Sequence, residues 1–305
     1  MPEPWPYLPI KPLRIGDSMT VCIAAICKAE NALILASDRM ISIGGYMSAD
    51  DLARKTEPLY YHWYSQFAAN DISSVVPIHE AIGRVDECHV ALECIADMTK
   101  KAYKEQRLSQ IEDEILGAYG LSWEDFRENG KSRLNERDFE IVTERIRSYD
   151  LSLEMLVAGF DGESEPHIFA VSNPGKVSFH DKLGFWAIGS GQHLAMGSLF
   201  SGQYDIYDGL DKCIAQVLSA NFAAESAEGV GDKTHCLVYT GKDESWLVPA
   251  KLHQAVKSGW HSLPRIPTDS LPKIRKFLDQ EKENEKTNPT YFTPERATHT
   301  TEDQQ

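Results

Sequence analysis

The feature that constrains the fold most is the short spacing between β-rich runs of the chain. Residues 20–26 and 32–37 are two apolar runs that only residues 27–31 separate. A second pair of runs, 152–160 and 165–171, is joined by a turn that contains Asp-Gly. Turns this short join antiparallel strands, because parallel neighbours need a crossover of about a dozen residues or more. The pattern therefore predicts sheets that are mainly antiparallel.

Longer stretches with the apolar spacing of helices separate these runs. Residues 73–103, 191–199 and 207–224 are typical of helices. The remaining β-rich runs predict a hairpin of 41–47 with 57–69, two short strands at 176–179 and 184–188, and a closing hairpin of 234–240 with 246–248. The order of elements is then strands, helices, strands, helices, strands. It predicts an α+β fold, a four-layer αββα sandwich in which helices cover the outer faces of two mainly antiparallel sheets.

Composition divides the chain into three regions. Residues 1–18 contain repeated prolines and predict an irregular extension or propeptide. Residues 19–263 carry all the periodic apolar patterns and predict one domain. Within it, residues 109–147 are charged and helix-prone, with apolar residues too sparse for a second core, so we expect a helical insertion there. Residues 264–305 are polar and predict a tail that is helical at first, over 273–284, and then disordered.

Charge and hydropathy exclude several classes of function. The formal net charge is -15, whereas a protein that binds a phosphate backbone needs a basic face. The sequence has no apolar run of roughly eighteen residues that would span a membrane, and its proline-rich start is no signal helix. The cysteines lack metal-ligand spacing and indicate free thiols in a reducing compartment. We expect a cytoplasmic protein with no nucleic-acid partner, no membrane partner and no metal.

Two groups of motifs indicate chemistry. In the first, Thr20 opens a strand, Asp38-Arg39 ends the next strand, and Lys55 follows 55 − 38 = 17 residues after Asp38. In the second, a strand ends in Gly-Phe-Asp, its hairpin partner follows, and an Ala-Ile-Gly-Ser-Gly turn around Ser190 opens a helix. Glycines suit a sharply turning backbone, and a serine at a helix N-terminus lies among free amides.

These motifs resemble those of proteasome β-type subunits, a family of N-terminal-nucleophile (Ntn) hydrolases. The resemblance is nearest to the bacterial proteasome-like group that includes the ancestral β-subunit type, in which Met directly precedes the Thr. It covers about 225 residues, from Met19 to Asp243. It implies the sandwich fold described above and the activity of a threonine-type endopeptidase, with no metal or organic cofactor.

The resemblance also implies a set of site residues. Thr20, Asp38, Lys55 and Ser190 occupy the catalytic positions. Further positions implied to support them are Arg39, Gly45, Gly189, Gly191, Glu228 and Asp232. The last two residues replace a family motif, D-x-x-S-G-G, whose serine this chain lacks. Arg54 is the alternative to Lys55, and Cys22 is a rival nucleophile because it lies 38 − 22 = 16 residues before Asp38, which is the family spacing.

The chemistry implied for this set depends on one nitrogen. An N-terminal Thr carries both a hydroxyl nucleophile and an α-amine, with a pKa of about 8, that can accept its proton. A neighbouring Lys55 ammonium would favour the neutral amine, Asp38 would hold the lysine, and amides of the turn at 44–45 would form the oxyanion hole. Thr20 must then be the first residue, either because translation starts at Met19 or because residues 1–19 are removed.

Two other functions are compatible with the same sequence. One is a catalytically silent proteasome-like subunit with a structural role, and the other is an Ntn amidase that acts on small amides. For the peptidase, the resemblance implies a peptide or unfolded-protein substrate and a homo-oligomeric ring or open ring. The resemblance is also compatible with an unidentified unfoldase as a partner.

Overall fold

A computed structural model of the protein describes residues 20–43, 47–49, 54–85, 90–241 and 244–262. The extension at 1–18, the predicted helix at 273–284 and the rest of the tail lie outside the described residues. The chain divides into two compact units, 1–258 and 259–305. Everything described below belongs to the first unit, apart from the end of the last helix.

The first sheet has five strands in the order β10-β1-β2-β11-β12, and all neighbours are antiparallel. Its strands are β1 (Cys22–Cys27), β2 (Ala32–Asp38), β10 (Phe185–Ile188), β11 (Thr234–Thr240) and β12 (Ser245–Leu247). The tight turn between β1 and β2 and the closing hairpin of β11 with β12 are both as the sequence predicts.

The second sheet has the order β5-β6-β7-β8-β9 and is also antiparallel throughout. Its strands are β5 (Thr56–Tyr60), β6 (Trp63–Ala69), β7 (Leu153–Phe160), β8 (Pro166–Ser172) and β9 (Lys176–Phe179). Two short strands, β3 (Ile41–Ile43) and β4 (Met47–Ala49), form a separate ladder.

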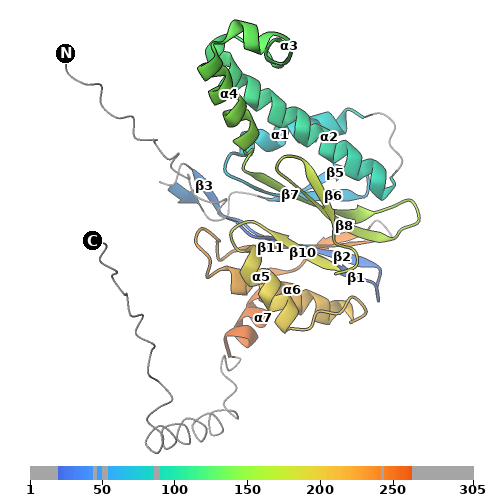
Figure 1. The fold of residues 1–305 in the computed structure, drawn as a ribbon. Helices are drawn as coiled ribbons and strands as arrows, with labels where there is room; N and C mark the ends of the chain where they lie inside the picture. The colour runs from blue at the N-terminus through green and yellow to red at the C-terminus, as the bar shows by residue number, and fades with distance from the viewer. Residues whose placement is uncertain (1–19, 44–46, 50–53, 86–89, 242–243, 263–305) are drawn as a thin grey trace, which may run out of the picture. The chain divides into compact units, whose positions relative to one another are not determined.

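Helices cover the outer face of each sheet (Figure 1). On the second sheet lie α1 (Val75–Gly83) and α2 (Leu92–Ile111), which contact β5 and β8 respectively. On the first sheet lie α5 (Gln192–Ser201) and α6 (Leu210–Ala224), which contact β10 and β2. The remaining helices are η1 (Ile72–Ser74), the π-helix η2 (Glu112–Leu116), η3 (Gly117–Tyr119), α3 (Trp123–Arg133), α4 (Glu136–Ser148) and α7 (Ala250–Ser262). The predicted four-layer α+β sandwich is confirmed.

The core follows the two-residue period of strands. Alternate residues of β1 (Cys22, Ala24 and Ile26) face the second sheet and pack with Leu156 and Ala158 of β7. On the other face of the second sheet, Trp63 and Phe169 pack with Ile78 of α1 and with Ile95 and Tyr103 of α2. The inner layer between the sheets fixes the sheets' relative position and thereby the site at their edge.

Two predicted elements are wrong in their extent. Residues 57–69 form a hairpin of their own, β5 with β6, and do not pair with 41–43, because Tyr61 turns the chain with a positive φ of 41°. The single helix expected over 73–103 is two helices, since α1 ends at Gly83 and α2 begins only at Leu92. The closing helix α7 was not predicted at all.

The segment at 109–147 also differs from expectation. It is helical, as predicted, but its apolar residues are not too sparse to form a core. Ile111, Ile115, Leu116, Leu121 and Val142 are buried together in a small cluster of their own. Val142 lies 142 − 121 = 21 residues after Leu121, and the packing of α4 against η2 brings it to the others.

The described cysteines are of two kinds. Cys22, Cys27, Cys213 and Cys236 are free and buried, as expected. Cys94 is disulfide-bonded, so the expectation of a free thiol is wrong for this residue. Among the described helices none is both long and apolar enough to cross a membrane.

His167 on β8 lies between two carboxylates, that of Asp161 in the turn between β7 and β8 and that of Asp181 after β9. Its Nδ1 is 2.8 Å from Asp181 Oδ2, and its Nε2 is 3.3 Å from Asp161 Oδ2. Its ring is stacked parallel to that of Trp63. The hydrogen bond to Asp181 raises the pKa of His167 above its ordinary value, against the opposing effect of burial.

This ion cluster predicts a pH-dependent contribution to stability. Because the pKa is raised in the folded state, the stabilisation is fully present below the unfolded-state pKa of about 6.5 and is lost as the pH rises through the folded-state pKa. We expect His167→Gln to lower the free energy of unfolding by up to about 1 kcal/mol more at acidic than at alkaline pH. Urea denaturation of the wild type and the variant, at pH values below and above the His167 pKa, measures how this loss changes with pH. The exposed His193, replaced by Gln, is the matched control, and a pH-independent effect of His167→Gln would contradict the assignment.

Candidate active site

The register of the first sheet brings three strand ends to one edge. Cys22 of β1 pairs with Ser37 of β2 on one side and with Ile188 of β10 on the other. Both neighbours are antiparallel to β1, so the start of β1 meets the ends of β2 and β10. Thr20, Asp38 and Ser190 therefore converge from distant parts of the sequence.

Asp38 is the centre of this cluster. Its side chain is fully buried. Oδ1 accepts hydrogen bonds from Thr20 Oγ1 at 2.6 Å, from the Val21 amide at 2.9 Å and from Lys55 Nζ at 2.8 Å. Oδ2 accepts from the amides of Met40 at 3.0 Å and Gly231 at 3.3 Å. A buried carboxylate is costly unless it is paired and hydrogen-bonded, and these donors from four segments supply that compensation.

Lys55 completes the contact with Thr20. Its side chain comes from the residue just before β5 in the second sheet and is 5% exposed. Nζ donates to Thr20 Oγ1 and also to Asp38 Oδ1. Arg54, the alternative in the sequence, is exposed. A fixed cation against a hydroxyl oxygen stabilises negative charge as it develops there.

Ser190 contacts the main chain of Thr20. The Thr20 amide donates to Ser190 Oγ at 3.2 Å. The serine hydroxyl lies within donating distance of two carbonyls, that of Thr20 at 3.3 Å and that of Glu228 at 3.2 Å. The Gly191 amide donates to the Thr20 carbonyl at 3.1 Å. The turn before α5 thus holds Thr20 by its backbone and leaves the threonine hydroxyl to Lys55 and Asp38.

Both glycines beside Ser190 are required by close packing. Gly189 has a φ of +88°, and a Cβ there would lie 2.5 Å from the Thr20 carbonyl oxygen and 2.6 Å from Thr20 Cγ2. A Cβ on Gly191 would lie 2.9 Å from the Cβ atoms of Val21 and Ala224. The turn can therefore approach β1 only because these two positions carry no side chain.

The other expected supporting residues are Glu228, Asp232, Arg39 and Gly45. Glu228 is exposed, and its backbone carbonyl accepts a hydrogen bond from the Ser190 hydroxyl. Asp232 is also exposed, and its carbonyl accepts from Lys257 Nζ. In the same segment, the Gly231 amide donates to Asp38 Oδ2 at 3.3 Å. The Arg39 amide donates to the Lys233 carbonyl at 3.0 Å, and Gly45 lies outside the described residues.

Cys22 is placed as a core residue. Its side chain faces the layer between the sheets and is fully buried, and Sγ donates to the Phe67 carbonyl at 3.5 Å. Burial raises the pKa of the Cys22 thiol to about 12. Because the thiolate is the reactive form, this arrangement favours Thr20 over Cys22 as the nucleophile.

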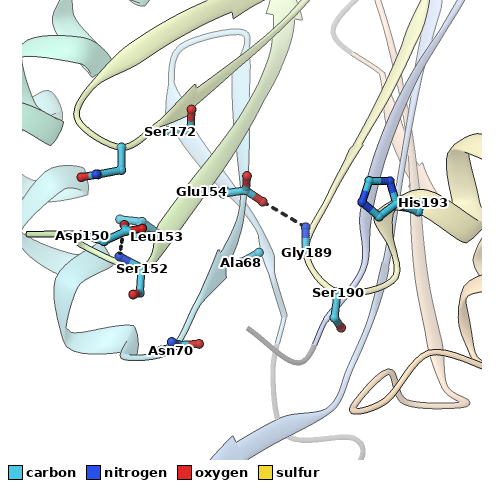
Figure 2. A pocket seen from close by; sticks show the side chains of 11 residues that line it. Ala68, Asn70, Asp150, Ser152, Leu153, Glu154, Ser172, Gly189, Ser190 and His193 are labelled. Carbon is cyan, nitrogen blue, oxygen red and sulfur yellow. Dashed lines mark hydrogen bonds between the residues drawn. The ribbon is translucent and has the colours of Figure 1, made fainter. Parts of the chain in front are cut away.

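A pocket of about 490 Å³ adjoins the turn at Ser190. It is lined by Ala68, Asn70, Asp150, Ser152, Leu153, Glu154, Ser172, Asn173, Gly189, Ser190 and His193. Figure 2 shows the Glu154 side chain extending from β7 towards Gly189. Its Oε2 accepts a hydrogen bond from the Gly189 amide at 3.2 Å. The sequence analysis missed Glu154, although a carboxylate within the apolar strand Leu153–Phe160 was a signal that could have found it.

Among the described residues, no group of three or more His, Cys, Asp or Glu side chains could hold a metal ion. The described site brings together a threonine hydroxyl, a buried ammonium–carboxylate pair and the backbone amides around them.

Comparisons with known proteins bear on the fold. No protein-family model matches the chain, and no curated protein matches it. Among solved structures it is similar to Anbu (ancestral beta-subunit) from Yersinia bercovieri, with 13% identity, a TM-score of 0.57, and coverage of 82% of this chain and 100% of the other. It is also similar to an Anbu (Gly-1) mutant from Hyphomicrobium sp. strain MC1, with 14% identity, a TM-score of 0.56, and coverage of 84% and 96%. The chain therefore has the fold of proteasome-like Ntn hydrolases.

The buried ion pair predicts a large loss of stability when one partner is removed. Asp38→Asn leaves Lys55 buried without its carboxylate, and we expect the free energy of unfolding to fall by at least about 3 kcal/mol. The matched control is Glu80→Gln, which removes the carboxylate of an exposed pair with Arg84 at 2.9 Å and should cost no more than about 0.5 kcal/mol. Urea denaturation of both variants measures the two losses. Equal losses would show that the Asp38 contacts do not stabilise the fold.

The packing of the Gly189 turn on Thr20 gives a second prediction. Gly189→Ala combines an unfavourable φ with a collision against Thr20, so we expect a destabilisation of about 2 kcal/mol or more. Gly197→Ala on α5 is the control, because a Cβ there meets nothing within 4 Å and should stabilise the helix by about 0.5–1 kcal/mol. Thermal or urea unfolding distinguishes the two variants, and a neutral Gly189→Ala would contradict the close approach.

Proposed function

We propose that the protein is a threonine-type peptidase of the proteasome-like Ntn class, with Thr20 as its nucleophile. The observation that carries the proposal is the buried contact of Thr20 Oγ1 with both Lys55 Nζ and Asp38 Oδ1. A threonine with only a structural role does not require a hydrogen bond from a buried lysine to its hydroxyl. These contacts support the catalytic roles proposed for Thr20, Asp38 and Lys55, and the hydrogen bond of the Thr20 amide to Ser190 Oγ supports the role proposed for Ser190.

The proposed reaction proceeds through an acyl-enzyme. Thr20 Oγ1 attacks the carbonyl carbon of a peptide bond, and the hydroxyl proton passes to the Thr20 α-amine. Lys55 stabilises the charge that develops on Oγ1, while Asp38 keeps the lysine in place. The tetrahedral intermediate collapses as the leaving amine takes the proton from the Thr20 ammonium. Water, deprotonated by the same amine, then hydrolyses the ester and regenerates the hydroxyl.

This mechanism requires a free amine at Thr20. In the chain as it stands, the Thr20 nitrogen belongs to a peptide bond and donates to Ser190 Oγ at 3.2 Å. Loss of residues 1–19 converts that nitrogen to an amine at the same place, next to both the hydroxyl and Ser190. The Ser190 hydroxyl can then accept from the amine and hold it towards the nucleophile. We propose that the amide of Gly45 contributes to the oxyanion hole.

The substrate and assembly are proposed by analogy with the similar structures. Both similar proteins are named Anbu, and the name of the one from Yersinia bercovieri identifies it as an ancestral beta-subunit, which favours association of this chain with its own copies in a ring or open ring. We propose a peptide or unfolded protein as the substrate, an unidentified unfoldase as a possible supplier of it, and the cytoplasm as the compartment. Residues 109–147, with their own small core, are proposed to be an insertion into the common fold.

One observation favours a second function. Thr20 is only 4% exposed, and its nitrogen is acylated in the uncleaved chain. A subunit that keeps residues 1–19 would therefore be catalytically silent and would serve a structural role in an assembly. The small-amide hydrolase remains the third candidate, because the same nucleophile would serve it.

The state of the mature N-terminus decides between these functions. We expect intact-mass measurement and N-terminal sequencing to find chains that begin at Thr20, and turnover of fluorogenic peptides to scale with their fraction. Thr20→Ala should abolish turnover, a loss of at least about 10³-fold, whereas Thr20→Ser should retain part of it. Native mass spectrometry of the same preparations tests the assembly.

Each other outcome selects a different function. Chains that always retain residues 1–19 and turn over nothing indicate the silent subunit. Chains with a confirmed Thr20 amine that cleave small acyl-amides but no peptide indicate the amidase. Peptide turnover that survives Thr20→Ala would refute Thr20 as the nucleophile.

A further inference from the structure

The pocket beside Ser190 has an unbalanced charge. Two of its lining residues carry carboxyl groups, Asp150 and Glu154, and none of the described lining residues is a lysine or arginine. The one lining histidine, His193, lies on α5, on the opposite side of the pocket from Asp150 (Figure 2). At neutral pH the walls therefore present negative charge to whatever enters.

The two carboxylates are not neutralised by their own contacts. Glu154 is half-buried and accepts one hydrogen bond from the Gly189 amide through Oε2. Asp150 is exposed and accepts one from the Ser152 amide at 2.8 Å through Oδ1. Both donors are uncharged amides, which hold each carboxylate in position and leave its charge in place. Residues 151–153 separate the two groups in the chain, and the Leu153 carbonyl accepts a hydrogen bond from the Tyr103 hydroxyl at 2.8 Å.

The basic residue behind this wall, Arg107, is not itself a lining residue, but it donates to one of them, Asn173. Arg107 on α2 donates to the carbonyls of Ile146 and Tyr149 and to Asn173 Oδ1. Its contacts lie with the residues that precede Asp150 and with the turn after β8, and it is not among the lining residues. The inner surface of the pocket also offers neutral oxygen acceptors on Asn70, Ser152 and Ser172.

The pocket adjoins the turn that contacts the proposed nucleophile, and Thr20 itself is not one of its lining residues. Two of its lining residues, Gly189 and Ser190, are the ones that contact the backbone of Thr20. Glu154 therefore touches, through one amide, the same turn that holds Thr20. With a volume of about 490 Å³, the pocket lies within the range of sites that hold small ligands or single side chains, about 300–1,000 Å³.

We propose that this pocket is a subsite for a cationic side chain of the peptide substrate, lysine or arginine, next to the bond that Thr20 cleaves. The proposal rests on the proposed peptidase function. Glu154 and Asp150 attract the cation, and the neutral oxygens of the lining accept hydrogen bonds from its N–H groups. A partly desolvated carboxylate opposite a cation discriminates strongly, because a neutral substrate leaves the carboxylate without its partner.

Arginine and citrulline peptides provide a direct test. The two side chains have nearly the same shape, but only arginine carries a charge. We expect a preparation with a confirmed Thr20 amine to cleave peptides with arginine at a position flanking the scissile bond with a kcat/KM at least about tenfold above that of the citrulline peptide. Both sides of the scissile bond are scanned, so that the preference also locates the subsite.

Substitutions that remove charge but keep hydrogen bonding identify the source of this preference. Glutamine at 154 and asparagine at 150 can still accept from the amides of Gly189 and Ser152. We expect Glu154→Gln to reduce the arginine-to-citrulline ratio of kcat/KM several-fold, and the double variant with Asp150→Asn to bring it close to one. Because the ratio compares two substrates on one enzyme, a general loss of activity does not affect it. Glu163→Gln, an exposed carboxylate at the turn between β7 and β8, is the matched control and should leave the ratio unchanged.

The possible failures are distinct. Turnover without a preference for arginine, or a preference that persists in the double variant, overturns the subsite proposal and leaves the peptidase intact. No turnover of any peptide by chains that begin at Thr20 overturns the proposed function and the subsite with it.

Discussion

The structure of the site depends on one buried carboxylate. Asp38 accepts hydrogen bonds from the start of β1, from Lys55 before β5, from Met40 just after β2, and from Gly231 before β11. Asp38 belongs to the first sheet and Lys55 adjoins the second, so their 2.8 Å contact joins the two layers at the edge where their apolar interface ends. A charge this deeply buried is stable only while its partners stay in place. The fold must therefore hold these segments together before any chemistry is available.

Close packing imposes the second constraint, and it acts on the backbone. The turn at Ser190 can reach Thr20 because Gly189 and Gly191 leave room that any side chain would fill. Main-chain groups do most of the holding, including the carbonyl of Glu228 and the amides of Gly191 and Gly231. Backbone positions are fixed by the sheets and helices that contain or adjoin them. The positions of the site residues are consequently fixed by the register of β1 with β2 and β10.

The two sides of Thr20 differ in polarity, and the proposed chemistry uses this difference. On the side of the sheet interface, Cys22 is buried among apolar side chains and its thiol pKa is raised, so the neighbouring thiol does not compete as a nucleophile. Within the site, the charge of Lys55 is matched by Asp38. In the pocket beyond Ser190, Glu154 and Asp150 have no cationic partner among the described lining residues. Under the proposed function, a cationic group of a peptide substrate would supply the missing charge there.

The sequence by itself determined the fold class and the order of its elements, because tight turns and two-residue or helical apolar periods are local properties. The resemblance of its motifs to those of proteasome β-type subunits also singled out Thr20, Asp38, Lys55 and Ser190, since the order and spacing of motifs are visible without a structure. The sequence did not predict three features, because each depends on which distant residues pack together. They are the break between α1 and α2, the hairpin at Tyr61 and the small core of 109–147. Only the tertiary structure decided that Lys55 and not Arg54 reaches Asp38, that Glu228 and Gly231 act through their backbone, and that Glu154 lies beside Gly189. Backbone hydrogen bonds and pocket walls leave no residue-type signature, since any residue carries an amide and a carbonyl, and only the folded chain fixes what they meet.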